Sequence, residues 1–330
     1  MANLGLSTVQ LLMTLLAFSA LWSGMWLALD ISYAITLILS VPAAGFLIRL
    51  FVIQHDCGHQ SYFNAARAND WVGRALGVLT LTPYGYWRKT HAAHHATSGN
   101  LDRRGVGDIT TLTVREYRAL SPMRRWLYRL YRNPIVLFML VPTILFVVLR
   151  RLPIESAAHR RDALFSILAN NVALAGVMAA MIALIGVTDF VKIQLPIMVV
   201  ASTIGVWLFF VQHQFEHGYW RAEDEWDFEQ AALQGSSYLR LPKVLQWLTA
   251  NIGLHHVHHL SSRIPNYRLQ ACLDRFPELV REAHEISLIG SLKCATLALW
   301  CEERQRLIRF RDVRMARGRV VALERRVRLG

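Results

Sequence analysis

The amino-acid sequence predicts an all-α integral membrane protein with four transmembrane helices, re-entrant or interfacial helices and a histidine-rich cytosolic cap. Hydrophobic residues make up 54% of the chain, which is rare in a soluble domain. Four long apolar runs are separated by polar segments, and eleven of the thirteen histidines gather in four short clusters outside those runs. The formal charge of +13 fits arginines at the cytoplasmic membrane surface better than a nucleic-acid-binding domain, so we expect no nucleic-acid partner.

The four apolar runs form two predicted transmembrane hairpins. The runs comprise residues 9–29, 31–53, 163–187 and 193–211. Each has about twenty residues, which is enough to cross the hydrocarbon core of a bilayer. Asp30 marks the turn of the first hairpin and Thr188-Asp189 that of the second. Both hairpins lead directly into a histidine cluster, so both should return to the same membrane face.

Two further apolar stretches are shorter. Residues 71–81 are too few to span, and residues 133–149 contain Pro134 and Pro142. Arginines flank the second stretch on both sides, namely Arg124, Arg125, Arg129, Arg132, Arg150, Arg151, Arg160 and Arg161. Because arginine favours the cytoplasmic side, both flanks should lie there, and we predict re-entrant or interfacial helices at 71–81 and 133–149. Both chain termini are then cytoplasmic.

The C-terminal segment 302–330 is rich in arginine. Two interpretations stay open: an amphipathic helix lying on anionic headgroups, or a solvated basic tail. The chain shows no internal repeat and no low-complexity linker, so we predict a single domain over residues 1–330.

The histidine clusters have the spacing expected of metal ligands. They are His55/His59, His91/His94/His95, His213/His217 and His255/His256/His258/His259. Residues three or four apart share one face of a helix, so the members of a cluster can direct their imidazoles to one point. Four such clusters next to a membrane would be costly to desolvate without a function, and metal coordination explains them together. His256 faces away from its neighbours and is expected behind the ligands, and His159 and His284 are expected at the surface.

Up to ten imidazoles exceed the four ligands of a tetrahedral zinc site and suit two metal ions. Imidazole binds iron, zinc, copper and nickel, so the ligand type leaves the metal open. The candidate ligands are His55, His59, His91, His94, His95, His213, His217, His255, His258 and His259. Carboxylates that can orient the imidazole N–H groups are Asp56, Asp102, Asp108, Glu216 and Asp227.

The three boxes H-x-x-x-H, H-x-x-H-H and H-x-x-H-H resemble those of the membrane fatty acid desaturases. They are carried here by His55/His59, His91/His94/His95 and His255/His258/His259, and the resemblance extends from about Gln54 to Tyr267. The sequences around the boxes are similar to those of bacterial acyl-lipid desaturases. The resemblance implies four membrane helices, a cytosolic di-iron cap, O2 as co-substrate and an acyl substrate. It also implies a further ligand after the last span, where His217 matches better than His213.

The expected reaction is the insertion of a cis double bond into a lipid acyl chain. Removing hydrogen from an unactivated methylene is beyond any side chain, so a metal cofactor must supply the oxidant. Gly105-x-Gly107 lacks the strand and third glycine of a dinucleotide fingerprint, so we expect a separate electron donor such as ferredoxin. The expected location is the bacterial inner membrane. The double-bond position and the acyl carrier (phospholipid, acyl-CoA or acyl-carrier protein) stay open.

Three alternatives compete with this interpretation, and one of them is a membrane sensor or scaffold with a histidine-rich zinc site. A lipid, alkane or carotenoid hydroxylase or ketolase of the same superfamily would share the histidine boxes, and its product would be an alcohol or ketone instead of an alkene. A metal transporter would place its ligands at mid-membrane, whereas the clusters here lie beyond the spans or in cytosolic stretches.

Overall fold

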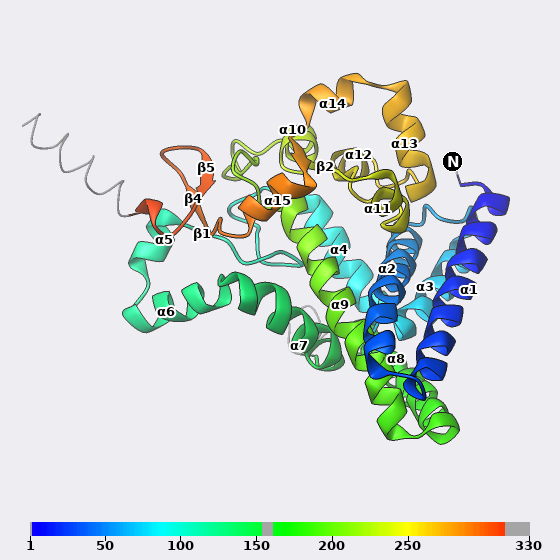
Figure 1. The fold of residues 1–330 in the computed structure, drawn as a ribbon. Helices are drawn as coiled ribbons and strands as arrows, with labels where there is room; N and C mark the ends of the chain where they lie inside the picture. Colours follow the sequence, from blue (N-terminus) through cyan, green and yellow to red (C-terminus); the bar gives the residue numbers. More distant parts are fainter. Residues whose placement is uncertain (1, 154–160, 314–330) are drawn as a thin grey trace, which may run out of the picture.

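The computed structural model describes residues 2–153 and 161–313, and four long helices dominate it (Figure 1). These are α1 (Leu4–Leu29), α2 (Tyr33–Gly58), α8 (Arg161–Ile185) and α9 (Val187–His213), and all four are long and apolar enough to cross a membrane. A helix of 26 residues is roughly 39 Å long at 1.5 Å per residue, more than the hydrocarbon thickness of a bilayer. The prediction of four spans in a mostly helical protein is confirmed.

The first hairpin is longer than its apolar runs. The side chains of Asn3 and Ser32 cap α1 and α2 by accepting hydrogen bonds from backbone N–H groups. The predicted spans stop at the last apolar residues, but α1 begins five residues before residue 9 and α2 continues five residues past Ile53. The extension of α2 carries His55 out of the apolar layer on a continuous helix.

The turn of the second hairpin lies earlier than predicted. Helix α8 ends at Ile185 and α9 begins at Val187, with Gly186 between them at φ 81°. This backbone conformation favours glycine, so Gly186 makes the turn and Thr188-Asp189 belongs to the first turn of α9.

The segment predicted as re-entrant is a bent helical arm. It comprises α6 (Pro122–Tyr131), the π-helix η1 (Val136–Leu140), α7 (Val141–Val147) and the 3₁₀ turn η2 (Leu149–Arg151). The two halves meet at 61°, which is the geometry of a broken span or a re-entrant loop. Figure 1 shows this arm running sideways from the four long helices. The other short apolar stretch belongs to α3 (Ala66–Leu79).

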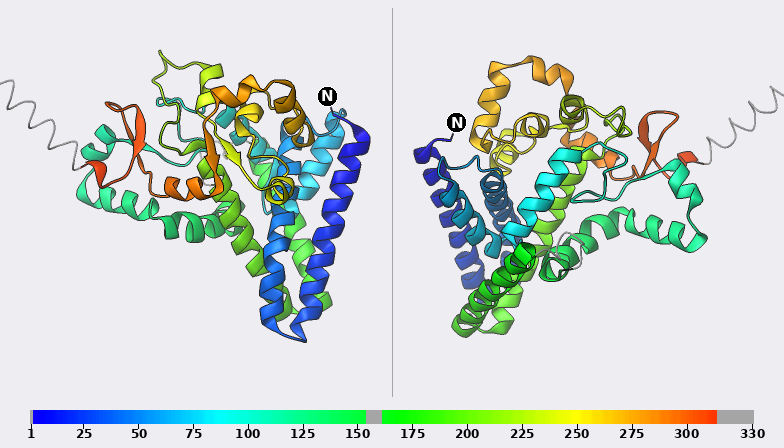
Figure 2. Two further views of the ribbon diagram at one scale, coloured as in Figure 1. Left: turned by 45° about the horizontal axis from the view of Figure 1, so that its top comes forward. Right: turned by 180° about the vertical axis from the view of Figure 1, so that it is seen from behind.

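Short elements form a cap over one end of the long helices (Figures 1 and 2). The helices are α4 (Tyr84–Thr97), α5 (Val114–Ala119), α10 (Phe228–Gln234), α11 (Lys243–Leu248), α12 (His255–Leu260), α13 (Asn266–Arg275), α14 (Glu278–Glu282) and α15 (Leu288–Cys294). The strands are β1 (Leu112–Thr113), β2 (Tyr238–Arg240), β3 (Glu285–Ser287), β4 (Leu299–Cys301) and β5 (Arg306–Ile308). Strand β4 pairs with β1 in parallel and with β5 antiparallel, and β2 pairs with β3 in parallel.

The start of the arginine-rich segment is not the amphipathic helix that was one of the two interpretations. Residues 306–308 form β5, and Leu299 lies opposite Ile308 in the sheet with β4. Leu307 and Ile308 are buried there, which fixes this part of the segment in the protein core. Residues 314–330 and His159 lie outside the described residues.

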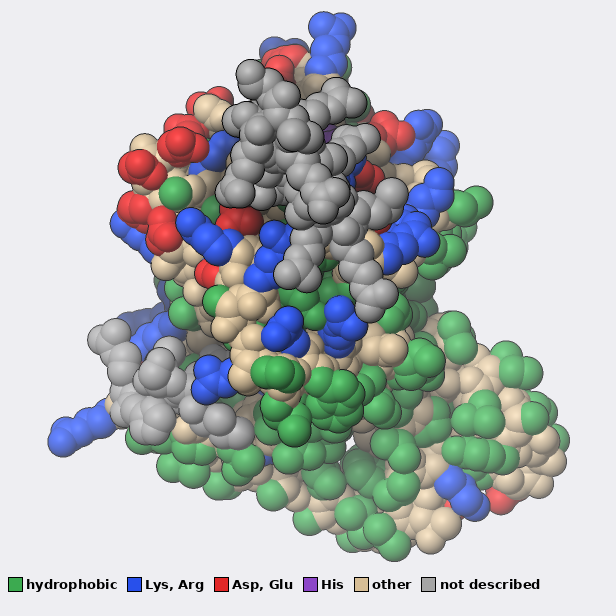
Figure 3. Space-filling view, turned by 90° about the vertical axis from the view of Figure 1, so that its left-hand side faces the viewer, with side chains coloured by type: hydrophobic (Ala, Val, Ile, Leu, Met, Phe, Trp, Pro, Cys, Tyr) green, Lys and Arg blue, Asp and Glu red, His purple; other side chains and the backbone are tan. Residues whose placement is uncertain are grey.

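Charge and apolarity separate along the molecule. In Figure 3 most charged side chains gather over the upper part of the molecule, and hydrophobic side chains cover most of the lower part. The N-terminal end of α1 is at the cap end as well, because the Asn3 backbone N–H donates to the Tyr267 hydroxyl at 2.9 Å. The protein is therefore an integral membrane protein whose described N-terminal end lies on the same side as the cap.

Candidate metal centre

Nine histidines converge in two groups between α2, α9 and the cap. The first histidine group is His55, His59, His91, His95 and His258, and the second is His94, His213, His255 and His259. Within each group one ring nitrogen per residue lies within 4.8 Å of all the others. All four members of the second group are buried, whereas three of the first group are half-buried.

The helical spacing decides which group a histidine joins. His91 and His95 are four residues apart on α4 and point to the first group, and His255 and His259 on α12 point to the second. His94 on α4 belongs to the second group, and His258 on α12 belongs to the first. Helices α4 and α12 therefore contribute to both groups, while α2 serves the first and α9 the second.

The segment after the last span differs from the expectation. His213 is the last residue of α9 and belongs to the second group, although the sequence favoured His217 over it. His217 is exposed, and its ring lies 6.2 Å from that of His284 instead of meeting either group. The chain leaves the helix at Gln214, so the four-residue spacing no longer places the two side chains on one face. His284, expected at the surface, is half-buried beside Phe215.

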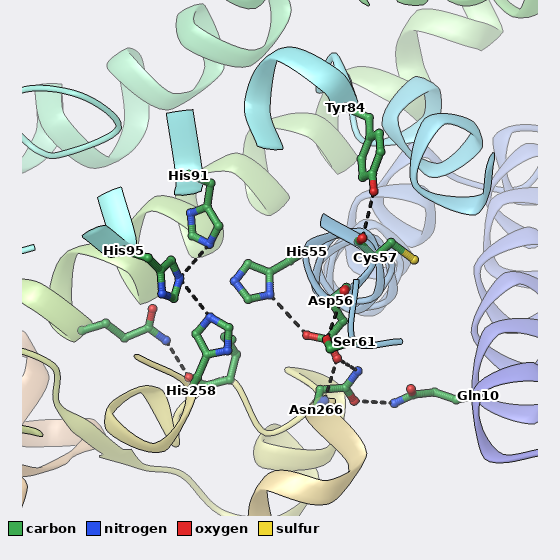
Figure 4. Close-up of polar contacts among 12 residues, drawn as sticks. Gln10, His55, Asp56, Cys57, Ser61, Tyr84, His91, His95, His258 and Asn266 are labelled. Atoms are coloured by element: carbon green, nitrogen blue, oxygen red, sulfur yellow. Dashed lines mark hydrogen bonds and ion pairs between the residues drawn. The ribbon is translucent and has the colours of Figure 1, made fainter. Parts of the chain in front are cut away.

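Within each group, ring nitrogens of different histidines lie close to one another. Nε2 of His213 lies 3.1 Å from Nε2 of His94 and 3.0 Å from Nε2 of His255. In the first group, Nε2 of His95 is 3.1 Å from Nε2 of both His91 and His258 (Figure 4). The buried Nε2 atoms of His59 and His259 have no hydrogen-bond partner. Nitrogen lone pairs that converge in this way fit the coordination of a cation.

The two groups are adjacent. The rings of His95 and His259, one from each group, stack with centroids 4.0 Å apart at an interplanar angle of 11°. The donor set therefore fits two metal ions held side by side, with five and four imidazoles available.

Two of the five candidate carboxylates contact these histidines. Asp108 accepts a hydrogen bond from Nδ1 of His94, and Asp56 lies 3.3 Å from Nδ1 of His55. A carboxylate on Nδ1 leaves Nε2 free as the ligand atom and fixes the plane of the ring. The other three make different contacts: Asp102 accepts from the Glu223 N–H, Glu216 pairs with Arg306, and Asp227 caps α10.

Asp56 is itself held by a residue that the sequence did not single out. The backbone N–H and the side-chain amide of Asn266 donate to Asp56 Oδ2 at 2.6 and 2.8 Å (Figure 4). The signal in the sequence was the run Ile264-Pro265-Asn266-Tyr267 after the third box. Aromatic rings also support the ligands, since Trp87 stacks on His91 at 4.6 Å and Phe209 lies 5.2 Å from His94.

The electrostatics favour neutral imidazoles. Burial, and next the neighbouring imidazoles, hold the pKa values of His91, His95, His258 and His259 well below the ordinary value for histidine. Neutral imidazole is the form that binds metals, so these side chains can coordinate a cation near neutral pH without first losing a proton. Burial also lowers the pKa of His256 to about 4, and its ring lies 5.7 Å from Tyr238, outside both groups, as expected.

A small cavity of about 10 Å³ lies against the second group. Asp108, Phe209 and His213 line it. This volume is about that of a single water-sized molecule.

Comparisons with known proteins agree with this geometry. A family model described as fatty acid desaturase matches residues 31–288, which is most of the chain. The chain belongs to the fatty acid desaturase family. It is 46% identical over 308 residues to a fatty acid desaturase of Bacillus subtilis, covering 93% of this chain and 87% of the relative.

More distant desaturases also match. An omega-3 fatty acid desaturase of the endoplasmic reticulum of Vigna radiata is 28% identical, over 78% of this chain and 67% of the relative. An sn-1 acyl-lipid omega-3 desaturase (ferredoxin) of Synechocystis is also 28% identical, over 72% of this chain and 66% of the relative. The protein is therefore a fatty acid desaturase, a di-iron oxidoreductase, and its two histidine groups are able to bind metal.

Proposed function

We propose that this desaturase uses two iron ions and O2 to insert a cis double bond into an acyl chain of a membrane lipid. The observation that carries the proposal is the pair of histidine groups at the end of four membrane helices. Overall, a –CH2–CH2– unit loses two hydrogens, and these two hydrogens together with O2, two electrons and two protons become two waters. Bound iron would supply the oxidising power for this chemistry, which no side chain has.

The proposed ligands are the nine histidines of the two groups. His55, His59, His91, His95 and His258 would hold one ion, and His94, His213, His255 and His259 the other. Asp56 and Asp108 orient His55 and His94 through Nδ1. We do not assign His217 as a ligand, because its exposed ring lies against His284.

The substrate and electron donor follow from chemistry and from the relatives. Synechocystis relatives act, by name, on acyl-lipids, and one of them is described with ferredoxin. An acidic ferredoxin would be attracted to this strongly basic protein, whose formal charge is +13. Reconstituted activity should then fall as ionic strength rises, and activity that is insensitive to both salt and arginine charge reversal would contradict this docking.

The proposed location is the inner membrane of a bacterium, with the cap and both termini in the cytoplasm. The arginine-rich flanks of the helical arm support this orientation, since arginine concentrates on the cytoplasmic side.

The function can be tested by expressing the chain in a desaturase-deficient host and analysing its fatty acids by gas chromatography. A new unsaturated fatty acid is expected, with the double-bond position located by derivatisation. His94→Ala, expressed at the same level, should give none of it, because Nε2 of His94 belongs to the second group. A new hydroxy fatty acid in place of the alkene would instead identify a hydroxylase.

A further inference from the structure

A cavity of about 650 Å³ lies outside the histidine groups, between α1, α2 and the cap. Its walls include Gln10 on α1, Arg49 on α2, and Lys243 and Trp247 on α11. This volume falls within the range of small-molecule sites, about 300–1,000 Å³. The cavity therefore has room for a ligand larger than an ion.

Arg49 brings a buried positive charge to this cavity. Its residue surface is 4% exposed although it lies within a membrane span. Its Nε donates to Thr14 Oγ1 at 3.3 Å, its Nη1 donates to the Trp247 carbonyl, and its guanidinium lies 4.3 Å from the centre of the Trp247 ring. No carboxylate pairs with it among residues 2–153 and 161–313. Ionisable residues inside membrane spans are costly and tend to be functional, and the positive charge of Arg49 can pair with an anionic ligand.

The rest of the lining includes both a cationic and an apolar part. Lys243 is exposed and adds a second cation, with no carboxylate partner in the described part of the chain. The lining also includes the α1 residues Leu6, Val9 and Met13, which are 49%, 65% and 38% exposed. Exposed apolar side chains on a transmembrane helix face lipid, so the cavity offers cations beside a lipid-facing surface. A phospholipid has the same arrangement, with a phosphate next to acyl chains.

A chain of polar contacts links the lining of the cavity to the first histidine group. Gln10 Nε2 donates to Asn266 Oδ1 at 2.8 Å, and Asn266 holds Asp56, which contacts His55 (Figure 4). Arg49 precedes His55 by six residues on α2, roughly 9 Å along the helix axis. A ligand in the cavity would thus lie close to the metal centre.

We propose that this cavity binds the phosphodiester group of a membrane phospholipid, with Arg49 and Lys243 as its cationic contacts. The inference rests on the proposed function in one respect: the bound lipid is then the acyl carrier of the substrate. Binding itself requires no iron, so it can be measured on the purified full-length protein without turnover.

The test is native mass spectrometry of the detergent-purified protein titrated with phosphatidylglycerol. Diacylglycerol with the same acyl chains should bind at least about ten-fold more weakly, because it lacks the phosphate. Lys243→Gln should weaken phosphatidylglycerol binding about ten-fold, the scale of one hydrogen bond to a charged group. Lys293→Gln is the matched control, an exposed lysine on α15 that does not line the cavity, and should leave binding unchanged. Arg49→Lys keeps the charge and should retain more binding than Arg49→Gln.

Several outcomes would overturn the proposal. Equal binding of diacylglycerol and phosphatidylglycerol would remove the phosphate from recognition, and equal effects of the two lysine variants would remove Lys243. Competition by inorganic phosphate at the same concentration as the lipid would identify a free-anion site, and stronger binding of acyl-CoA would identify a different carrier. Normal phosphatidylglycerol binding by a protein that forms no alkene would reject the proposed function and leave this site standing.

Discussion

His213 and His217 are only four residues apart in the sequence, but His213 lies in the second group and His217 is exposed at the surface. The spacing of a histidine pair predicts a shared face only while the helix continues, and α9 ends between these two residues. His55 and His59 do share a face, because α2 continues to Gly58 and His59 is the residue that caps it. The convergence of the three boxes was therefore predictable from spacing. The placement of His213 rather than His217 in the second group was not, because an apolar run does not show where α9 ends.

Replacing His213 and His217 separately tests this difference. His213→Ala should lower the iron content of the purified protein by about one ion per chain, because it removes one of four imidazoles in the second group. His217→Ala should keep the wild-type iron content and activity. Metal analysis of both purified variants decides, and iron loss in His217→Ala alone would restore the ranking expected from the sequence.

Asp108 should act on the metal through His94. Asp108→Asn replaces a charged acceptor on Nδ1 with a neutral amide, so iron affinity or activity should fall about 10- to 100-fold. Asp102→Asn is the matched control, since Asp102 contacts the Glu223 N–H instead of a histidine. Iron retention measured during chelator titration compares them, and identical curves would rule out a role for Asp108.

The metal-free protein should be sensitive to acid. In the folded protein the pKa values of His91, His95, His258 and His259 lie well below the ordinary value near 6.5. The unfolded chain therefore binds more protons below about pH 6.5, and folding stability is lost as the pH falls through that value. Thermal unfolding of metal-free protein between pH 8 and pH 5.5 should show a falling midpoint, and a midpoint that rises on acidification would contradict neutral buried imidazoles.

At the scale of elements, apolar runs located all four spans but not their ends. Polar residues such as Ser7 and Gln54 stopped the predicted spans, yet both are fully buried and lie within helices. Strand β5 was unpredictable for another reason: its three residues pair with β4, and this tertiary partner outweighs the arginine content of the segment. The re-entrant or interfacial character of the bent arm was predictable, because Pro134, Pro142 and the basic flanks are visible in the sequence.

Close packing between α3 and the segment leading to α4 depends on a glycine. A Cβ atom at Gly77 would lie 2.5 Å from the Thr82 carbonyl oxygen, whereas one at Gly176 on α8 would meet nothing within 4 Å. Gly77→Ala should therefore destabilise the protein by about 1–3 kcal/mol through overpacking. Gly176→Ala should be neutral or slightly stabilising, because alanine is the better helix former. Thermal unfolding in one detergent compares them, and equal midpoints would show that the backbone yields at residue 77.

At the scale of the whole molecule, two hairpins bring every proposed ligand to one end of the membrane helices. The N-terminal end of α1 lies there as well, held by Tyr267. An even number of spans explains this arrangement, and it was predictable from counting apolar runs. The assignment of one domain to residues 1–330 stays a prediction.

Reporter fusions test the proposed orientation. Alkaline phosphatase fused in the turn after Asp30 or at Gly186 should be active, because both turns would face the periplasm. A green fluorescent protein at residue 330 should fluoresce, because the C-terminus would be cytoplasmic. Activity of the phosphatase at residue 330 and none at the turns would reverse the orientation.

Helices α2, α4, α9 and α12 all contribute imidazoles to the two groups, and each group draws on three of these helices. A bound ion is therefore a cross-link between distant parts of the chain, and its binding energy adds to folding energy. A cell short of iron should then lose this protein to proteolysis as well as lose its activity. The abundance of the enzyme would follow iron supply after translation, and with it the fluidity of the membrane.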